Sequence, residues 1–122
     1  MDTNTSLDLR WARIDSAKYS SATLTLHVSG VRGWGVRRTG MIMFHNVTAV
    51  HSYDMRTNEE VLLPTGVTIV RWQWHQHQAE FSTQTYTGPG ETQDTDVSVV
   101  FGNVQVALHL SISATLAYWA QH

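Results

Sequence analysis

Two histidines separated by a single residue, His75 and His77, are the clearest candidates for chemistry in this sequence. They lie in residues 71–81 (RWQWHQHQAEF), where Trp and His alternate with Gln. On a β-strand, residues i and i+2 project from the same face, so both imidazoles can reach one divalent metal ion. His109, on the polar side of the last predicted strand, is the candidate third ligand. The alternative is a pair of solvated histidines on an outward face, and no other cofactor is expected.

An HxH pair followed by a Glu is similar to the first cupin motif, with Glu80 in the place of the acidic residue. The resemblance implies a cupin-like, metal-dependent enzyme that uses the HxH pair. Other catalytic patterns are absent from the sequence. There is no cysteine, and no Ser lies in a GxSxG turn, so a Cys or Ser nucleophile has no support. A non-enzymatic protein is therefore favoured.

A second candidate site is the glycine-rich segment 30–40 (GVRGWGVRRTG), in which Trp34 lies between two glycines and Arg32, Arg37 and Arg38 are close by. Glycine lets such a segment project as a loop, Trp offers a large contact area, and guanidinium groups pair with carboxylates. We expect this loop to bind a partner protein with an acidic surface, with Trp34 as the anchor and the arginines as its rim. The alternative is a hairpin tip whose Trp covers one end of the fold.

The overall charge and hydropathy exclude some partners. Eight Lys and Arg residues against ten Asp and Glu give a net charge of -2, without the basic excess of nucleic-acid-binding proteins. No apolar run approaches the roughly 20 residues that span a bilayer, and the first residues lack a secretory signal. We expect a cytoplasmic protein that binds neither nucleic acid nor a membrane.

The elements that must position these residues are strands, because apolar and polar residues alternate with a period of two. The alternation is longest over residues 104–119, where Leu108 and Leu110 are predicted to be buried. We predict an all-β single domain over residues 1–122. It would be an antiparallel β-barrel, or a strongly curved sheet or sandwich, of about seven strands, with residues 1–6 as a disordered tail.

Trp72 and Trp74 share the strand face opposite to the two histidines. Because they are the apolar set of this segment, they are predicted to face the core while His75 and His77 face outward. The alternative is an exposed aromatic platform that stacks on a sugar. Five Trp residues in 122 keep a carbohydrate-binding domain among the hypotheses.

A short similarity links two parts of the chain, FHNV at residues 44–47 and FGNV at residues 101–104. In the second copy, Gly102-Asn103 suits a two-residue hairpin turn. In the first copy, His45-Asn46 is a poorer tight turn, so a hairpin and a β-bulge are both open there.

Residues 11–53 carry a family resemblance. They read WARIDSAKYSSATLTLHVSG, then the Gly/Arg-rich segment, then MIMFHNVTAVHSY. This order of strands resembles small all-β bacterial proteins found among the polymorphic-toxin immunity families. The resemblance implies an inhibitor-like protein that docks onto or neutralises a partner protein, and it assigns no functional residue. A protein-binding module is therefore the leading hypothesis, ahead of a metal-dependent enzyme and a carbohydrate-binding domain.

Overall fold

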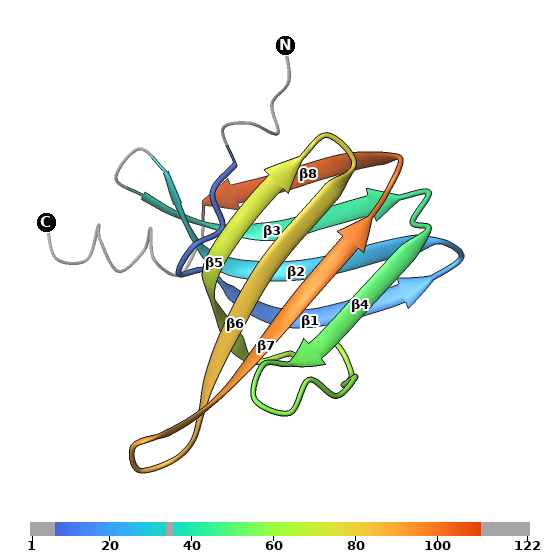
Figure 1. Cartoon of the computed structure of the whole chain (residues 1–122). Coiled ribbons are helices and arrows are strands. Elements are labelled where there is room, and N and C mark those ends of the chain that lie inside the picture. The colour runs from blue at the N-terminus through green and yellow to red at the C-terminus, as the bar shows by residue number, and fades with distance from the viewer. Residues whose placement is uncertain (1–6, 34–35, 111–122) are drawn as a thin grey trace, which may run out of the picture.

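The structure is a computed structural model that describes residues 7–33 and 36–110. This part of the chain is all-β, as predicted, with eight strands rather than about seven (Figure 1). The strands are β1 (Arg13–Ser20), β2 (Thr23–Gly33), β3 (Val36–His45), β4 (Ala49–Asp54), β5 (Val67–His75), β6 (Gln78–Gly88), β7 (Glu91–Val100) and β8 (Asn103–Leu110). The predicted tail, residues 1–6, lies outside the described residues.

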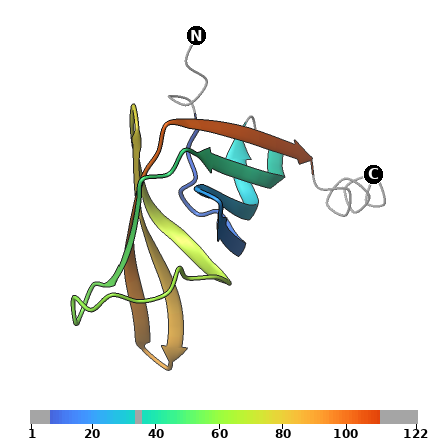
Figure 2. The ribbon, with the colours of Figure 1, turned by 90° about the vertical axis from the view of Figure 1, so that its right-hand side faces the viewer.

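All eight strands form one antiparallel sheet in the order β4-β7-β6-β5-β1-β2-β3-β8. The sheet does not close into a barrel, because β4 and β8 are its two edges. It curves until β4, β5, β6 and β7 form a front layer that covers a back layer of β1, β2, β3 and β8 (Figures 1 and 2). The layers are joined within the sheet by a short β1–β5 pairing of two residue pairs. The curved sheet or sandwich is therefore the correct alternative.

The hydrophobic core lies between the two layers and follows the period-two alternation. Every second residue of the central strands points inward, so the buried set comes from both layers. The N-terminal segment adds to it, because Ile69 N donates a 2.8 Å hydrogen bond to Ala12 O and Leu9 is fully buried. The largest fully buried side chains are Phe44, Phe81, Leu9, Ile14, Leu24, Leu26, Ile42, Ile69, Val28, Val99 and Thr83.

The last strand is buried less than the sequence predicted. Strand β8 confirms the first part of the predicted run, and residues 111–119 lie outside the described residues. Leu108 is half-buried and Leu110 is 50% exposed, so the prediction that both are buried is wrong. The reason is that β8 is an edge strand. Along the row Val31, Arg38, Leu110, side chains change from buried on β2 to half-buried on β3 and exposed on the edge strand.

The FHNV and FGNV segments are crossovers between the layers, and the predicted turns are wrong. Strand β8 pairs with β3 and not with β7, so Gly102-Asn103 forms no hairpin. The first copy connects β3 to β4 and is neither a tight hairpin nor a bulge. The two crossovers lie side by side, since Gly102 N donates to His45 O at 2.9 Å and Thr48 N donates to Val100 O at 2.9 Å. A Cβ atom at Gly102 would lie 2.9 Å from that of Asn46, which accounts for the glycine in the second copy.

Candidate functional site

The predicted histidine pair does not share a strand. Strand β5 ends at His75 and β6 begins at Gln78, so His77 lies in the turn between them. The assumption that strand alternation places both imidazoles on one face is therefore wrong, although both side chains are exposed as predicted. His77 has a structural contact instead. Its Nδ1 lies 3.1 Å from Gly102 O, and its own carbonyl accepts a 2.9 Å hydrogen bond from Phe101 N.

The structure does not bring the three predicted metal ligands together. His109 lies on β8 in the back layer, opposite Thr39, whereas His75 ends a strand of the front layer. Within residues 7–33 and 36–110, no group of three His, Asp or Glu side chains is arranged to hold a metal ion.

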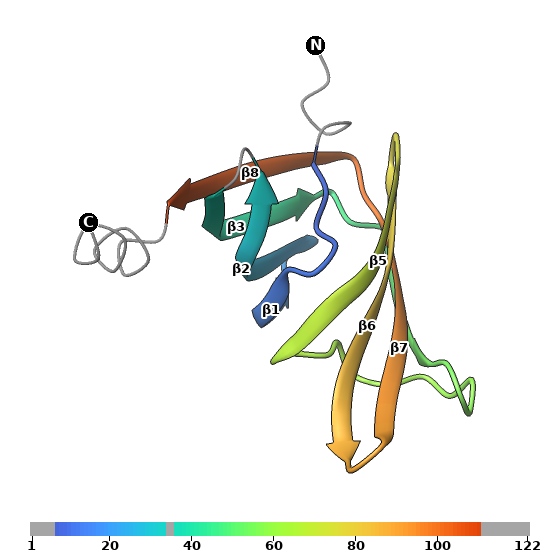
Figure 3. The same ribbon diagram turned by 90° about the vertical axis from the view of Figure 1, so that its left-hand side faces the viewer.

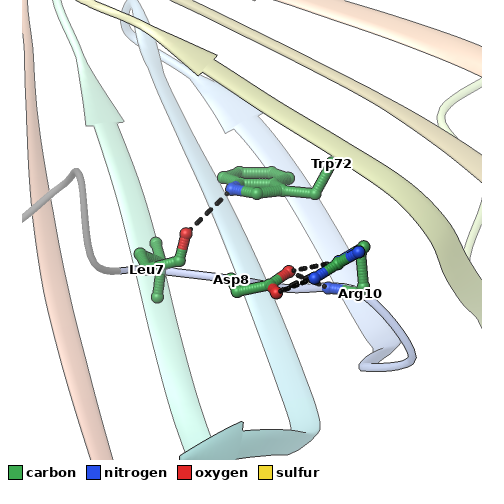
Figure 4. A network of polar contacts seen from close by, with 4 residues as sticks. All are labelled: Leu7, Asp8, Arg10 and Trp72. Atoms are coloured by element: carbon green, nitrogen blue, oxygen red, sulfur yellow. Dashed lines mark hydrogen bonds and ion pairs between the residues drawn. The ribbon is translucent and has the colours of Figure 1, made fainter.

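Trp72 and Trp74 face the core, as predicted, and belong to an aromatic cluster. Both are half-buried, with ring centroids 5.5 Å apart, and Trp72 lies 5.8 Å from Phe81. The indole Nε1 of Trp72 donates a 3.1 Å hydrogen bond to Leu7 O, which fixes the N-terminal segment against β5 (Figure 4). The pair is thus engaged in packing, and it is not the exposed platform that a carbohydrate-binding domain would use.

Beside that contact, Asp8 and Arg10 form a local ion pair (Figure 4). The Arg10 guanidinium donates Nη2 to Asp8 Oδ2 at 2.8 Å and also donates through Nε. This side-chain hydrogen bond is the main reason why the pKa of the Asp8 carboxyl is lowered. Both side chains are largely exposed, so the pair orders the segment more than it stabilises the fold.

The predicted interaction loop is the end of the β2–β3 hairpin, which extends to the left in Figure 1. Most of residues 30–40 are strand, so the prediction of a loop over this whole segment is wrong. Arg32 and Arg37 are direct cross-strand partners and both are exposed. Arg38 is half-buried and lies opposite Val31. Trp34, the predicted anchor, lies outside the described residues.

The three hairpin arginines lack a carboxylate partner in the described part of the chain. The ion pairs found there are Asp8–Arg10, Arg13–Asp15 and Arg71–Asp96. Like charges that lie directly opposite one another in a β-ladder are destabilising. The Arg32–Arg37 pair therefore costs the isolated protein stability, and the carboxylates of an acidic partner would offset this repulsion.

A group of residues that sequence reasoning missed lies on the outer face of the front layer. One row of cross-strand partners runs Arg71, Ser82, Asp96, Tyr53, and the next runs Gln73, Glu80, Ser98, His51. We call these eight residues the outer-face grid. The polar alternation of each strand was visible in the sequence. The order in which the four strands lie side by side was not, and only that order brings the residues together.

Comparison with known proteins gives no match: no family model, curated protein or solved structure is similar to this chain. Among the described residues there is also no helix with the length and apolar character needed to cross a bilayer. The hairpin arginines and the outer-face grid are therefore the features from which a function can be inferred.

Proposed function

We propose that this protein is a non-enzymatic protein-binding module that docks onto an acidic surface of a partner protein through the end of the β2–β3 hairpin. The observation that carries the proposal is the placement of Arg32 and Arg37 as direct cross-strand partners, with Arg38 beside them and no described carboxylate to neutralise them. Two guanidinium groups are thus gathered on one face of the hairpin, with Arg38 on the other face opposite Val31, on a chain whose net charge is -2.

The chemistry of guanidinium favours a carboxylate-rich partner. Its planar fork donates two parallel hydrogen bonds to one carboxylate, which gives orientation as well as energy. A nucleic acid would require basic residues along an extended surface, and the negative net charge opposes such binding. An acidic protein patch needs only a local cluster of this size.

Two further parts of the proposal come from the sequence. Trp34, two residues after Arg32, is proposed as the anchor of the interface, because Trp and Arg contribute most often to binding energy at such sites. The resemblance of residues 11–53 to immunity-type proteins suggests that docking neutralises the partner. In this proposal the protein acts in the cytoplasm and needs no metal or other cofactor.

The experiment is a charge reversal at the hairpin. The double variant Arg32→Glu/Arg37→Glu is compared with Arg56→Glu, an exposed arginine in the β4–β5 connection. After affinity capture and identification of the partner, isothermal titration gives Kd for each variant. We expect the hairpin variant to bind at least about 100-fold more weakly, since it loses two interfacial charge pairs and each is commonly worth about 2 kcal/mol. We expect Arg56→Glu to bind as the parent protein does.

The dependence on salt provides the second readout. Steering by surface charge falls with ionic strength, so the association rate of the parent protein should drop as salt rises, while that of the hairpin variant should not. Equal affinities for the hairpin variant and Arg56→Glu would refute the proposed docking surface.

A further inference from the structure

We propose that the outer-face grid on β5, β6, β7 and β4 is a binding site for a neutral carbohydrate chain. This site is separate from the hairpin and does not depend on the function proposed there. The strands that carry it form the front layer, whose outer side faces the reader in Figure 1 and is seen edge-on in Figure 3.

The grid is an ordered surface and not a chance gathering of polar residues. Each of its two rows contains one residue from each of four adjacent strands, and direct cross-strand partners project from the same face. Three inter-strand steps of about 4.8 Å make each row roughly 14 Å long. The rows are separated by two residues along a strand, or about 7 Å. The surface is therefore long and narrow, as a short run of linked sugar rings is.

Hydrogen bonds within the grid hold its side chains in place. In the first row, Arg71 Nε donates to Ser82 Oγ at 3.2 Å, and Ser82 Oγ donates to Asp96 Oδ1. Ser82 is buried and anchors both neighbours. In the second row, the Gln78 amide beside the grid donates to Glu80 Oε1 at 3.0 Å. Groups that are fixed in advance lose less conformational entropy when a ligand binds.

The grid still has hydrogen-bonding capacity to offer a ligand. The Arg71 guanidinium has five N–H groups, and the carboxylates of Asp96 and Glu80 each have a second oxygen. These three residues line a shallow depression of about 240 Å³, together with Tyr53, Val97 and Ser98. Next to it lies a depression of about 300 Å³ that also contains Arg71 and Asp96 and reaches Asp94. The Oδ1 atom of Asp94 is buried without a hydrogen-bond partner among the described residues.

The mixture of charges selects a neutral polyol over an anion. One guanidinium stands among the carboxylates of Glu80, Asp94 and Asp96, so phosphate, sulfate and uronic acids are repelled. A sugar hydroxyl both donates and accepts, and it can therefore pair with the guanidinium and with a carboxylate at once. The charged side chains of a basic peptide only donate, and they would place positive charge against Arg71.

Tyr53 supplies the apolar contact that a sugar ring needs. It ends the first row, is 37% exposed, and is stacked on His51 with an interplanar angle of 12° and ring centroids 5.9 Å apart. Aromatic side chains present a large, rigid apolar surface with a polar tip, which suits the mixed apolar and polar faces of a sugar. The aromatic contact thus comes from Tyr53 and not from the core-facing Trp pair.

The test is an NMR titration of the ¹⁵N-labelled protein with defined probes. The neutral probes are oligosaccharides of glucose, xylose, mannose and N-acetylglucosamine, the acidic probe is oligogalacturonate, and the basic probe is oligolysine. Tyr53→Ala and Glu80→Gln are compared with two matched controls outside the grid. These are Tyr86→Ala, where the parent tyrosine is 80% exposed, and Glu59→Gln, where the parent glutamate is exposed.

We expect at least one neutral oligosaccharide to shift the amides of β5, β6, β7 and β4 with a Kd of about 1 mM or tighter. We expect Tyr53→Ala and Glu80→Gln to weaken its binding at least about tenfold, with the controls unchanged and all variants folded by circular dichroism. The hairpin variant Arg32→Glu/Arg37→Glu should bind the sugar normally, which separates this site from the proposed function.

Three results would each overturn the proposal. The first is the absence of binding to every neutral probe at about 10 mM, and the second is binding of oligogalacturonate or oligolysine alone. The third is an equal loss of sugar binding in Tyr86→Ala and Tyr53→Ala.

Discussion

Replacing Gly40 by Ala should detach part of β8 from the sheet. Gly40 lies on β3 opposite Leu108 of β8. Strand β8 is an edge of the sheet, and β3 is the one strand it pairs with. A Cβ atom at this position would lie 1.9 Å from Ala107 O, and 2.9 Å from both Ala107 C and Leu108 Cα. These are backbone atoms, so no side-chain rotation relieves the overlap, and β8 itself must move.

The size of the effect follows from that distance. Ordinary contact begins at 3.4 Å, so the backbone of β8 must shift by about 1.5 Å. A ladder hydrogen bond of about 2.9 Å does not survive such a shift. Two lost bonds cost about 1–3 kcal/mol, and residual overpacking costs a similar amount. The lower entropy of unfolded Ala returns about 0.4–1 kcal/mol. We therefore expect Gly40→Ala to lower the free energy of unfolding by about 1–5 kcal/mol.

The assay is urea unfolding combined with amide hydrogen exchange. At about 4 °C per kcal/mol for a chain of this size, the loss should also lower Tm by roughly 4–20 °C. The matched control is Gly88→Ala, where the added Cβ meets Glu91 Oε2 at an ordinary 3.6 Å. Exchange should quicken in β8 and the facing half of β3, while β1 and β2 stay protected. The close approach of β8 would be refuted if Gly40→Ala were as stable as Gly88→Ala, or if protection fell evenly over all strands.

Three other substitutions or conditions test the remaining features. Trp72→Phe keeps an aromatic ring in the cluster but loses the indole hydrogen bond, so chemical denaturation should show a loss of about 0.5–1.5 kcal/mol; an unchanged midpoint would mean that the bond does not fix the N-terminal segment. Arg37→Glu turns a repulsive pair with Arg32 into an attractive one, so the free protein should gain about 0.2–1 kcal/mol, and a loss would show that the arginines do not repel. Backbone amides of Thr57 and Arg56 hold the pKa of the Asp54 carboxyl below its ordinary value of 3.8. Its contribution to stability is present above pH 3.8 and is lost as the pH falls through the lowered value, so a ¹³C titration should place its midpoint below that of an exposed Asp.

The fold class could be predicted because strand periodicity is a local property. Alternation in residues 22–29 and 97–101 places Leu24, Leu26, Val97 and Val99 in the core, and the structure buries all four. The same rule placed Trp72 on the inner side of its strand without any knowledge of the neighbouring strands. Alternation reports which side of a strand is apolar, and nothing more is needed for this part of the prediction.

Predictions that depended on neighbouring strands were wrong. Leu110 has the parity of a core residue, but its strand lies at the edge of the sheet, and its side chain is exposed there. Gly102-Asn103 has the composition of a hairpin turn, yet the strands on either side of it lie in different layers. Local chemistry permits a turn at such a site, and the tertiary pairing decides which strands it joins.

The histidine pair failed for a related reason. The HxH argument required β5 to continue through His77, but the strand turns after His75. Gln76-His77 is a two-residue connection without Gly or Asn, the residues that usually mark such turns. The turn is fixed from outside by the bond between His77 and Gly102, a contact between residues 25 positions apart that no local pattern reveals.

The two candidate surfaces differ in how binding would affect the protein. In the grid, Arg71 and Asp96 already share hydrogen bonds with Ser82, so a sugar would add contacts to a surface that is partly prearranged. At the hairpin, Arg32 and Arg37 repel each other until a partner supplies carboxylates. Binding there removes an unfavourable interaction in addition to forming favourable ones, so the free protein is less stable than one without this pair. A surface that is kept at such a cost is better explained by a partner than by the fold, whereas the grid is compatible with the fold at no cost. For this reason the hairpin, and not the grid, is the basis of the proposed function.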